Sequence, residues 1–123
     1  MDKNIEFDNM FDSRSKALKM GLRLRELILS FFLEIDESII GGTKIKLALY
    51  SRGGKNNLLC GIQQGKNDSC MLYVHHVLEI SHERLNLIGK GKHSKQIKFN
   101  NLDEINEKDI NWLFGLIDEK APF

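Results

Sequence analysis

The fold is decided by residues 44–76, which read KIKLALYSRGGKNNLLCGIQQGKNDSCMLYVHH. Apolar residues alternate with other residues in three stretches of this segment, at 44–50, 57–63 and 70–76. A period of two is typical of a half-buried β-strand. Glycine, asparagine and serine cluster between the stretches, where they favour short turns. The segment therefore predicts three antiparallel strands joined by short turns.

The same alternation predicts which side chains of these strands share a face. In the first stretch one face carries Ile45, Leu47 and Leu49. We expect Tyr50 and Tyr73 on the face opposite the apolar one, because neighbouring residues of a strand point to opposite sides. Two tyrosines beside lysines suit the stacking of single-stranded nucleic acid, and they equally suit a homodimer interface. Two such residues do not distinguish these alternatives.

Helical periodicity flanks the predicted strands on both sides. Residues 13–33 predict a long helix, with Asp12 or Ser13 as its N-cap, and 34–39 predict a further short helical turn. Residues 107–119 predict a second long helix after Asn106, a good N-cap. The apolar residues that recur at helical spacing, and are expected in the core, are Ala17, Met20, Leu24, Leu27, Ile28, Phe31, Phe32, Ile110, Trp112, Leu113, Phe114 and Ile117.

The remaining segment supplies a fourth strand at 95–100 and a short helix at 83–88. The predicted fold class is α+β, with two long helices packed on one face of a mainly antiparallel sheet of four to five strands. Residues 1–123 form a single domain by the usual size range, and residues 1–12 are expected to be an N-terminal extension with little order.

Composition narrows the classes of function. Lys and Arg number 18 against 17 Asp and Glu, so no strong field favours a nucleic-acid or membrane partner. Cys60 and Cys70 are too few for a disulfide framework, and we expect both as small buried apolar residues. The absence of a secretion signal and of a long apolar run predicts a cytoplasmic protein. No nucleophile or metalloprotease motif is present, which favours a protein other than an enzyme.

A basic stretch precedes and includes the fourth predicted strand. It contains Lys90, Lys92, His93 and Lys95, and no acidic residue lies between Arg84 and Leu102. Glycines at 89 and 91 allow backbone amides to approach an anion closely. We therefore expect an anion-binding site on these four residues. The alternative is a solvated edge, since lysines on an edge strand also prevent strand-to-strand association.

Several short motifs resemble the YdhG-like family of bacterial domains. They are Glu37-Ser38-Ile39, Cys60-Gly61-Ile62 followed by Lys66-Asn67, GKGKHSKQIKF at 89–99, and Leu102-Asp103-Glu104-Ile105. The resemblance spans residues 24–118 and implies an α/β sandwich related in shape to frataxin, in a family for which iron chaperoning has been proposed. The chain departs from the pattern at Gly41, where an aromatic residue is frequent, and at Thr43-Lys44, where Met-Pro is frequent.

The resemblance directs attention to Glu34, Asp36 and Glu37, which cluster after the first predicted helix. Carboxylate oxygens are hard ligands that suit iron, and these three form the candidate metal site. The alternative is an ordinary acidic surface. We therefore expect a binding or chaperone-like protein with iron as the implied cargo and with an unidentified protein or small ligand as partner. The competing expectation is a small-ligand or anion-binding protein, or an enzyme, that uses a pocket between the sheet and the helices.

Overall fold

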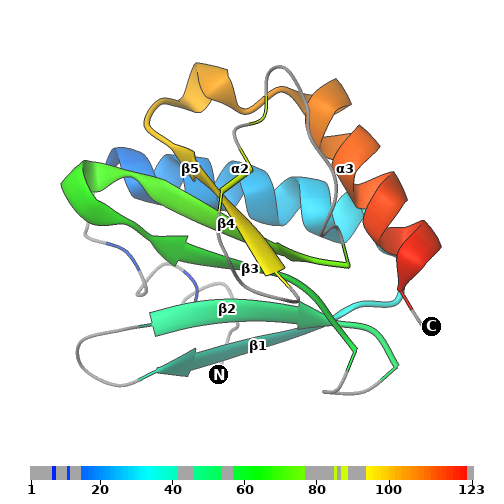
Figure 1. Ribbon diagram of the computed structural model, residues 1–123. Helices are drawn as coiled ribbons and strands as arrows, with labels where there is room; N and C mark the ends of the chain where they lie inside the picture. Colours follow the sequence, from blue (N-terminus) through cyan, green and yellow to red (C-terminus); the bar gives the residue numbers. More distant parts are fainter. Residues whose placement is uncertain are drawn as a thin grey trace.

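The computed structural model describes Phe7, Phe11 and residues 15–41, 46–53, 57–76, 85, 87–88 and 94–121. The described elements form a five-stranded antiparallel sheet with two long helices (Figure 1). In chain order the elements are α2 (Lys16–Phe31), β1 (Asp36–Gly41), β2 (Lys46–Ser51), β3 (Leu58–Gln64), η1 (Lys66–Asp68), β4 (Cys70–His75), β5 (Ser94–Phe99), η2 (Leu102–Glu104) and α3 (Glu107–Lys120).

The strands are neighbours in the sheet in the order in which they occur in the chain. This confirms the predicted antiparallel arrangement and the four predicted strands. The helical turn predicted at 34–39 is wrong, because Asp36–Gly41 is strand β1 and pairs with β2 along its whole length. The β-branched Ile39 and Ile40 favour this extended backbone, and pairing with β2 outweighs the weak helical pattern.

Each long helix begins at a polar cap. Ser15 accepts a hydrogen bond from the backbone amide of Leu18, while the predicted caps Asp12 and Ser13 lie outside the described residues. Asn106 accepts hydrogen bonds from the backbone amides of Lys108 and Asp109, which confirms the predicted cap of α3. α2 contacts β3 and β4, and α3 contacts α2 (Figure 1).

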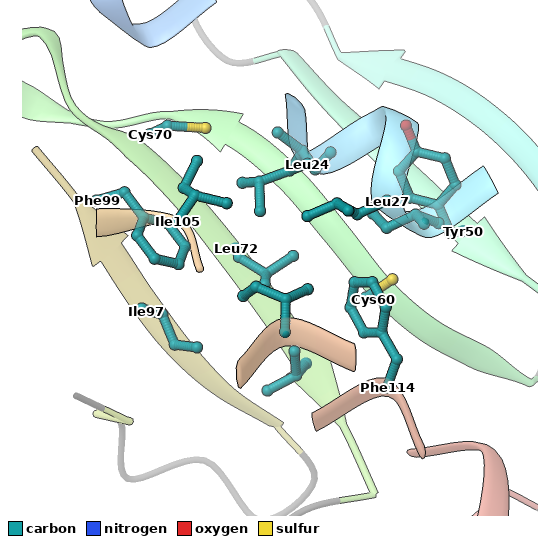
Figure 2. Close-up of a cluster of buried hydrophobic side chains, with 14 of the residues drawn as sticks. Leu24, Leu27, Tyr50, Cys60, Cys70, Leu72, Ile97, Phe99, Ile105 and Phe114 are labelled. Carbon is teal, nitrogen blue, oxygen red and sulfur yellow. The ribbon is translucent and has the colours of Figure 1, made fainter. Parts of the chain in front are cut away.

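The core brings the buried side chains of these elements together. Figure 2 shows Leu24 and Leu27 of α2 beside Leu72 of β4 and Phe114 of α3. In β2 the fully buried side chains are Ala48 and Tyr50, whereas Leu47 and Leu49 are half-buried. The prediction of Tyr50 on the opposite face is therefore wrong. Its register decides the face, because Tyr50 lies opposite the buried Cys60.

Two aromatic regions also differ from expectation. Trp112 is 40% exposed rather than part of the core, because the buried residues of α3 lie on the side of the helix opposite to it. Phe7 and Phe11 are both buried although they belong to the expected extension, and their ring centroids lie 5.6 Å apart. The Phe11 ring lies against Gly21, where an added Cβ would approach within 2.5 Å of it. A helical glycine, which costs about 1 kcal/mol relative to alanine, is thereby explained.

The connection between β4 and β5 is described at four residues, which are His76, Leu85, Leu87 and Ile88. Leu85 is buried, and Ile88 forms an antiparallel bridge with Gln96 of β5. Half of the residues of the helix predicted at 83–88 lie outside the described residues, and its last residue, Ile88, pairs with β5 instead. Among the described elements, neither helix is long and apolar enough to cross a bilayer.

Candidate functional site

A salt bridge joined by a tyrosine hydrogen bond lies where α2 meets β1 and β2. The Arg25 Nε donates to Glu37 Oε2 at 2.7 Å, and its Nη2 donates to Glu37 Oε1 at 3.0 Å. The Tyr50 hydroxyl donates to the same Glu37 Oε2 at 2.6 Å. The two parallel hydrogen bonds from a guanidinium fix both the distance and the orientation of the carboxylate. We call these three residues the Arg25–Glu37–Tyr50 network.

The network is withdrawn from water. The side chain of Glu37 is 5% exposed and that of Arg25 is 19% exposed, while Tyr50 is fully buried. The Phe7 ring covers the guanidinium, with Arg25 Cζ 5.4 Å from its centroid. Burial, followed by the hydrogen bond to Glu37, raises the pKa of Tyr50, so its hydroxyl stays a donor. The hydrogen bond to Glu37 raises the pKa of Arg25. The arrangement therefore anchors β1 to α2.

The three predicted metal ligands occupy different environments. Glu34 is exposed in the turn after α2, and Asp36 is exposed on β1. Glu37 is the next residue on that strand, so its side chain points to the other face, where Arg25 and Tyr50 hold it. Within the described part of the chain, no three His, Cys, Asp or Glu side chains form a group able to hold a metal ion.

Most of the predicted anion site falls outside the described residues. Lys90, Lys92 and His93 are not among them, and Lys95 lies on β5 opposite Val74. Lys98 lies opposite Met71, on the other face of the same strand from Lys95. An anion site here would therefore include Lys95 and exclude Lys98, and it stays a prediction.

The two cysteines lie in the core as expected. Cys60 on β3 and Cys70 on β4 are both fully buried (Figure 2). Burial raises the pKa of both thiols, that of Cys70 to about 12. A thiol rather than a thiolate is therefore present at neutral pH, and neither cysteine has the character of a nucleophile or metal ligand.

The face of the sheet opposite Ala48, Cys60 and Leu72 carries several partly exposed apolar side chains among polar ones. Its central row follows the strand registers through Ser38, Leu49, Gly61, Tyr73 and Gln96, one residue from each strand. Leu47 and Leu49 lie above Gly61, and the Tyr73 hydroxyl donates to Gln63 Oε1 at 2.8 Å. We call the apolar part of this face the outer sheet surface, and define it as Ile40, Leu47, Leu49, Met71 and Tyr73.

A pocket of about 300 Å³ lies between β5 and the start of α3. Its lining comes from β5, η2 and the first turn of α3, and the predicted use of a pocket between sheet and helices stays a prediction. Asn106, whose side chain caps α3, is part of the lining. The full lining consists of Ile97, Lys98, Phe99, Asp103, Glu104, Asn106 and Asp109. One of the three acidic residues of this lining has a structural role, because Glu104 Oε1 accepts hydrogen bonds from the backbone amides of Asn100 and Asn101.

A contact between distant parts of the chain was missed by sequence reasoning. The Asp68 carboxylate accepts hydrogen bonds from the backbone amides of Lys16 and Ala17, both at 3.0 Å. The turn between β3 and β4 thereby caps the start of α2. Asn67 and Asp68 both have positive φ angles, of 57° and 59°. The local signal for this turn is the Asn-Asp pair, because asparagine and aspartate both tolerate a left-handed backbone.

Comparison with family models, with curated proteins and with solved structures gave no match to this chain.

Proposed function

We propose that this chain is a non-enzymatic, chaperone-like binding domain, and that its outer sheet surface binds apolar segments of other proteins. The observation that carries the proposal is the chemistry of that surface. Ile40 is 49% exposed, and Leu47, Leu49, Met71 and Tyr73 are half-buried. Methionine adapts its shape to different partners, and tyrosine is enriched where proteins meet. Such a surface suits partners that share apolar character rather than one exact shape.

The layer arrangement supports this proposal. Side chains along β4 alternate between buried and half-buried, as expected when helices cover one face of a sheet and leave the other accessible. Contacts of α2 with β3 and β4, and of α3 with α2, support placing both helices on the same face. This is the arrangement that the resemblance to the YdhG-like and frataxin-like folds implies.

A client-holding assay tests the proposal. The full chain is added to a chemically denatured model enzyme, and light scattering follows aggregation after dilution. We expect the wild-type protein to suppress scattering and Leu47→Lys/Tyr73→Lys to lose most of this effect. The matched control is Leu22→Lys/Trp112→Lys, because both of these residues are apolar, 40% exposed and located on helices. Equal activity of the two double variants, or none in the wild type, overturns the proposal.

Iron is the cargo that the resemblance implies, and Glu34 and Asp36 are the exposed carboxylates available to it. The test is anaerobic titration with Fe(II) under reducing conditions. Glu34→Ala/Asp36→Ala is the informative variant, because replacing Glu37 as well would disturb the Arg25–Glu37–Tyr50 network. Saturable binding that this variant loses supports the iron proposal, and binding that it retains removes these ligands.

The pocket between β5 and α3 supports a second candidate, a small-ligand-binding protein. Asp103 lies in its lining, so the pocket offers a carboxylate as a hydrogen-bond acceptor. A small polar ligand carrying an amine fits this acceptor. Thermal-shift measurements with a panel of amino acids and amino alcohols test it, with Asp103→Asn as the binding variant and Glu119→Gln as the surface control. Shifts that Asp103→Asn leaves unchanged would exclude the pocket.

A further inference from the structure

The two edge strands of the sheet differ in how they are protected. The β5 edge carries Lys95 and Lys98, and Ile88 pairs with Gln96 through backbone hydrogen bonds of 2.9 and 2.7 Å. Lysines and a chain segment that covers the edge are two devices that prevent association at a sheet edge. Strand β1, Asp36–Gly41, contains no lysine, arginine or proline, and its register with β2 continues without a bulge. Among the described residues, β1 pairs with β2 alone.

Strand β1 is also held in position before any partner arrives. Glu37, in the middle of the strand, is fixed by two hydrogen bonds from Arg25 and one from Tyr50. An edge held in an extended conformation loses little further conformational freedom when another strand pairs with it, and association is favoured accordingly. The Arg25–Glu37–Tyr50 network therefore prepares β1 as a template for pairing.

We propose that β1 pairs antiparallel with β1 of a second copy of this chain, so that one sheet continues through a dimer. A two-fold axis perpendicular to the sheet keeps corresponding faces of the two copies on the same side. Residues that lie opposite each other must then point to the same face of the sheet, and the register centred on Ile39 satisfies this requirement. It places Ile39 opposite the Ile39 position of the second copy, Ser38 opposite Ile40, and Glu37 opposite Gly41.

Charge favours this pairing over the parallel one. A parallel, in-register pair would place Asp36 and Glu37 directly opposite their own copies, and like charges at opposed positions destabilise a strand pair. The antiparallel register instead separates the acidic ends of the two strands and brings two β-branched side chains together at its centre. Cross-strand contacts between such side chains stabilise a sheet. The proposal rests on the backbone edge of β1, and Ile40 is the one side chain that this edge shares with the outer sheet surface used for the proposed function.

Sedimentation equilibrium of the full chain tests the dimer. We expect a concentration-dependent mass that rises from 14.2 kDa toward twice that value. Ile40→Glu, at a position 49% exposed, should raise the dissociation constant roughly ten-fold or more, because the register places its carboxylate diagonal to Asp36 of the second copy, where like charges repel. The matched control is Ile88→Glu, at a position 40% exposed beside the other edge, and it should leave the dimer unchanged. A monomer at every concentration, or a dimer that only Ile88→Glu disrupts, overturns the proposal.

Cysteine crosslinking tests the register itself. Ser38→Cys and Ile40→Cys are prepared as separate proteins, and the native Cys60 and Cys70 do not interfere because they are fully buried. Opposed positions lie within disulfide reach, whereas diagonal positions are about 7–8 Å apart. We expect a disulfide-linked dimer in an oxidised mixture of the two proteins and little in either protein alone. Crosslinking in each protein alone contradicts this register. Pairing of β1 with an added basic peptide in place of a second copy would overturn the dimer.

Discussion

The Arg25–Glu37–Tyr50 network and the aromatic cluster around Phe114 hold the helices in place by different physical means. In the aromatic cluster, the Phe114 ring centroid lies 5.7 Å from that of Phe31 and 5.3 Å from that of Phe32. Such packing scales with buried area and tolerates changes of shape that keep the volume. The network instead depends on hydrogen-bond direction, so it fixes where β1 lies. We therefore expect packing to contribute most of the free energy of unfolding, and the network to fix where β1 lies against α2.

The largest expected effect is in the aromatic cluster. Phe114→Ala removes a fully buried ring that contacts both Phe31 and Phe32, and we expect a loss of about 3–5 kcal/mol in the free energy of unfolding. Phe114→Leu keeps most of the volume and should cost less than about 1.5 kcal/mol. Urea denaturation measures both values. Similar losses for the two variants would contradict the view that volume governs this region.

The next-largest expected effect tests whether the network fixes β1 as well as stabilising the fold. Arg25→Met leaves the Glu37 carboxylate buried without its cation, and we expect a loss of about 3 kcal/mol, the lower end for a buried pair because Arg25 is partly exposed. Arg25→Met/Glu37→Leu removes both charges and should recover most of the loss. The double variant should still fold, but the proposed dimer should weaken because β1 is no longer fixed. Unchanged dimerisation would show that the network does not prepare the edge.

A smaller effect isolates one donor of the network. Tyr50→Phe keeps the buried ring and removes the hydroxyl that donates to Glu37, and we expect a loss of about 1–2 kcal/mol. Thermal and urea unfolding measure it, with Tyr73→Phe as the control. The Tyr73 hydroxyl also donates one hydrogen bond, to the uncharged Gln63, so its removal should cost less. An equal loss in both variants would show that the carboxylate of Glu37 adds nothing.

The sequence predicts elements well where the local pattern and the tertiary structure agree. The alternation in 44–76 and the helical pattern around Leu113 each correspond to an observed element, and both cysteines lie in the core. The local pattern failed at 34–39, where pairing with β2 makes a strand, and at Tyr50, whose face is set by its register with Cys60. Register and pairing partner depend on residues distant in sequence, and periodicity alone does not report them.

The candidate site was less predictable for the same reason. Glu37 was identified from its acidic neighbours, yet its role depends on Arg25 twelve positions earlier and on Tyr50 thirteen positions later. The sequence around a charged strand residue does not indicate whether that residue binds a metal ion or a buried guanidinium. The cap that Asp68 provides for α2 joins residues more than fifty positions apart, beyond the reach of any local motif.

The smallest expected effect concerns this cap and depends on pH. Hydrogen bonds from the backbone amides of Ala17 and Lys16 lower the pKa of Asp68 below its ordinary value of 3.8. The folded state therefore holds the carboxylate ionised more strongly than the unfolded state does. The resulting stability is fully present above about pH 4 to 5, where the unfolded chain is also ionised, and is lost as the pH falls through the folded pKa.

Asp68→Asn keeps a residue type suited to the φ of 59° but removes the charge. We expect its melting temperature to be lower than that of the wild type at pH 7 and to converge with it toward pH 2. Asn106→Ala removes the uncharged cap of α3 and should cost about 1 kcal/mol at either pH. If the difference between wild type and Asp68→Asn stays constant across this range, the ionised carboxylate is not what caps α2.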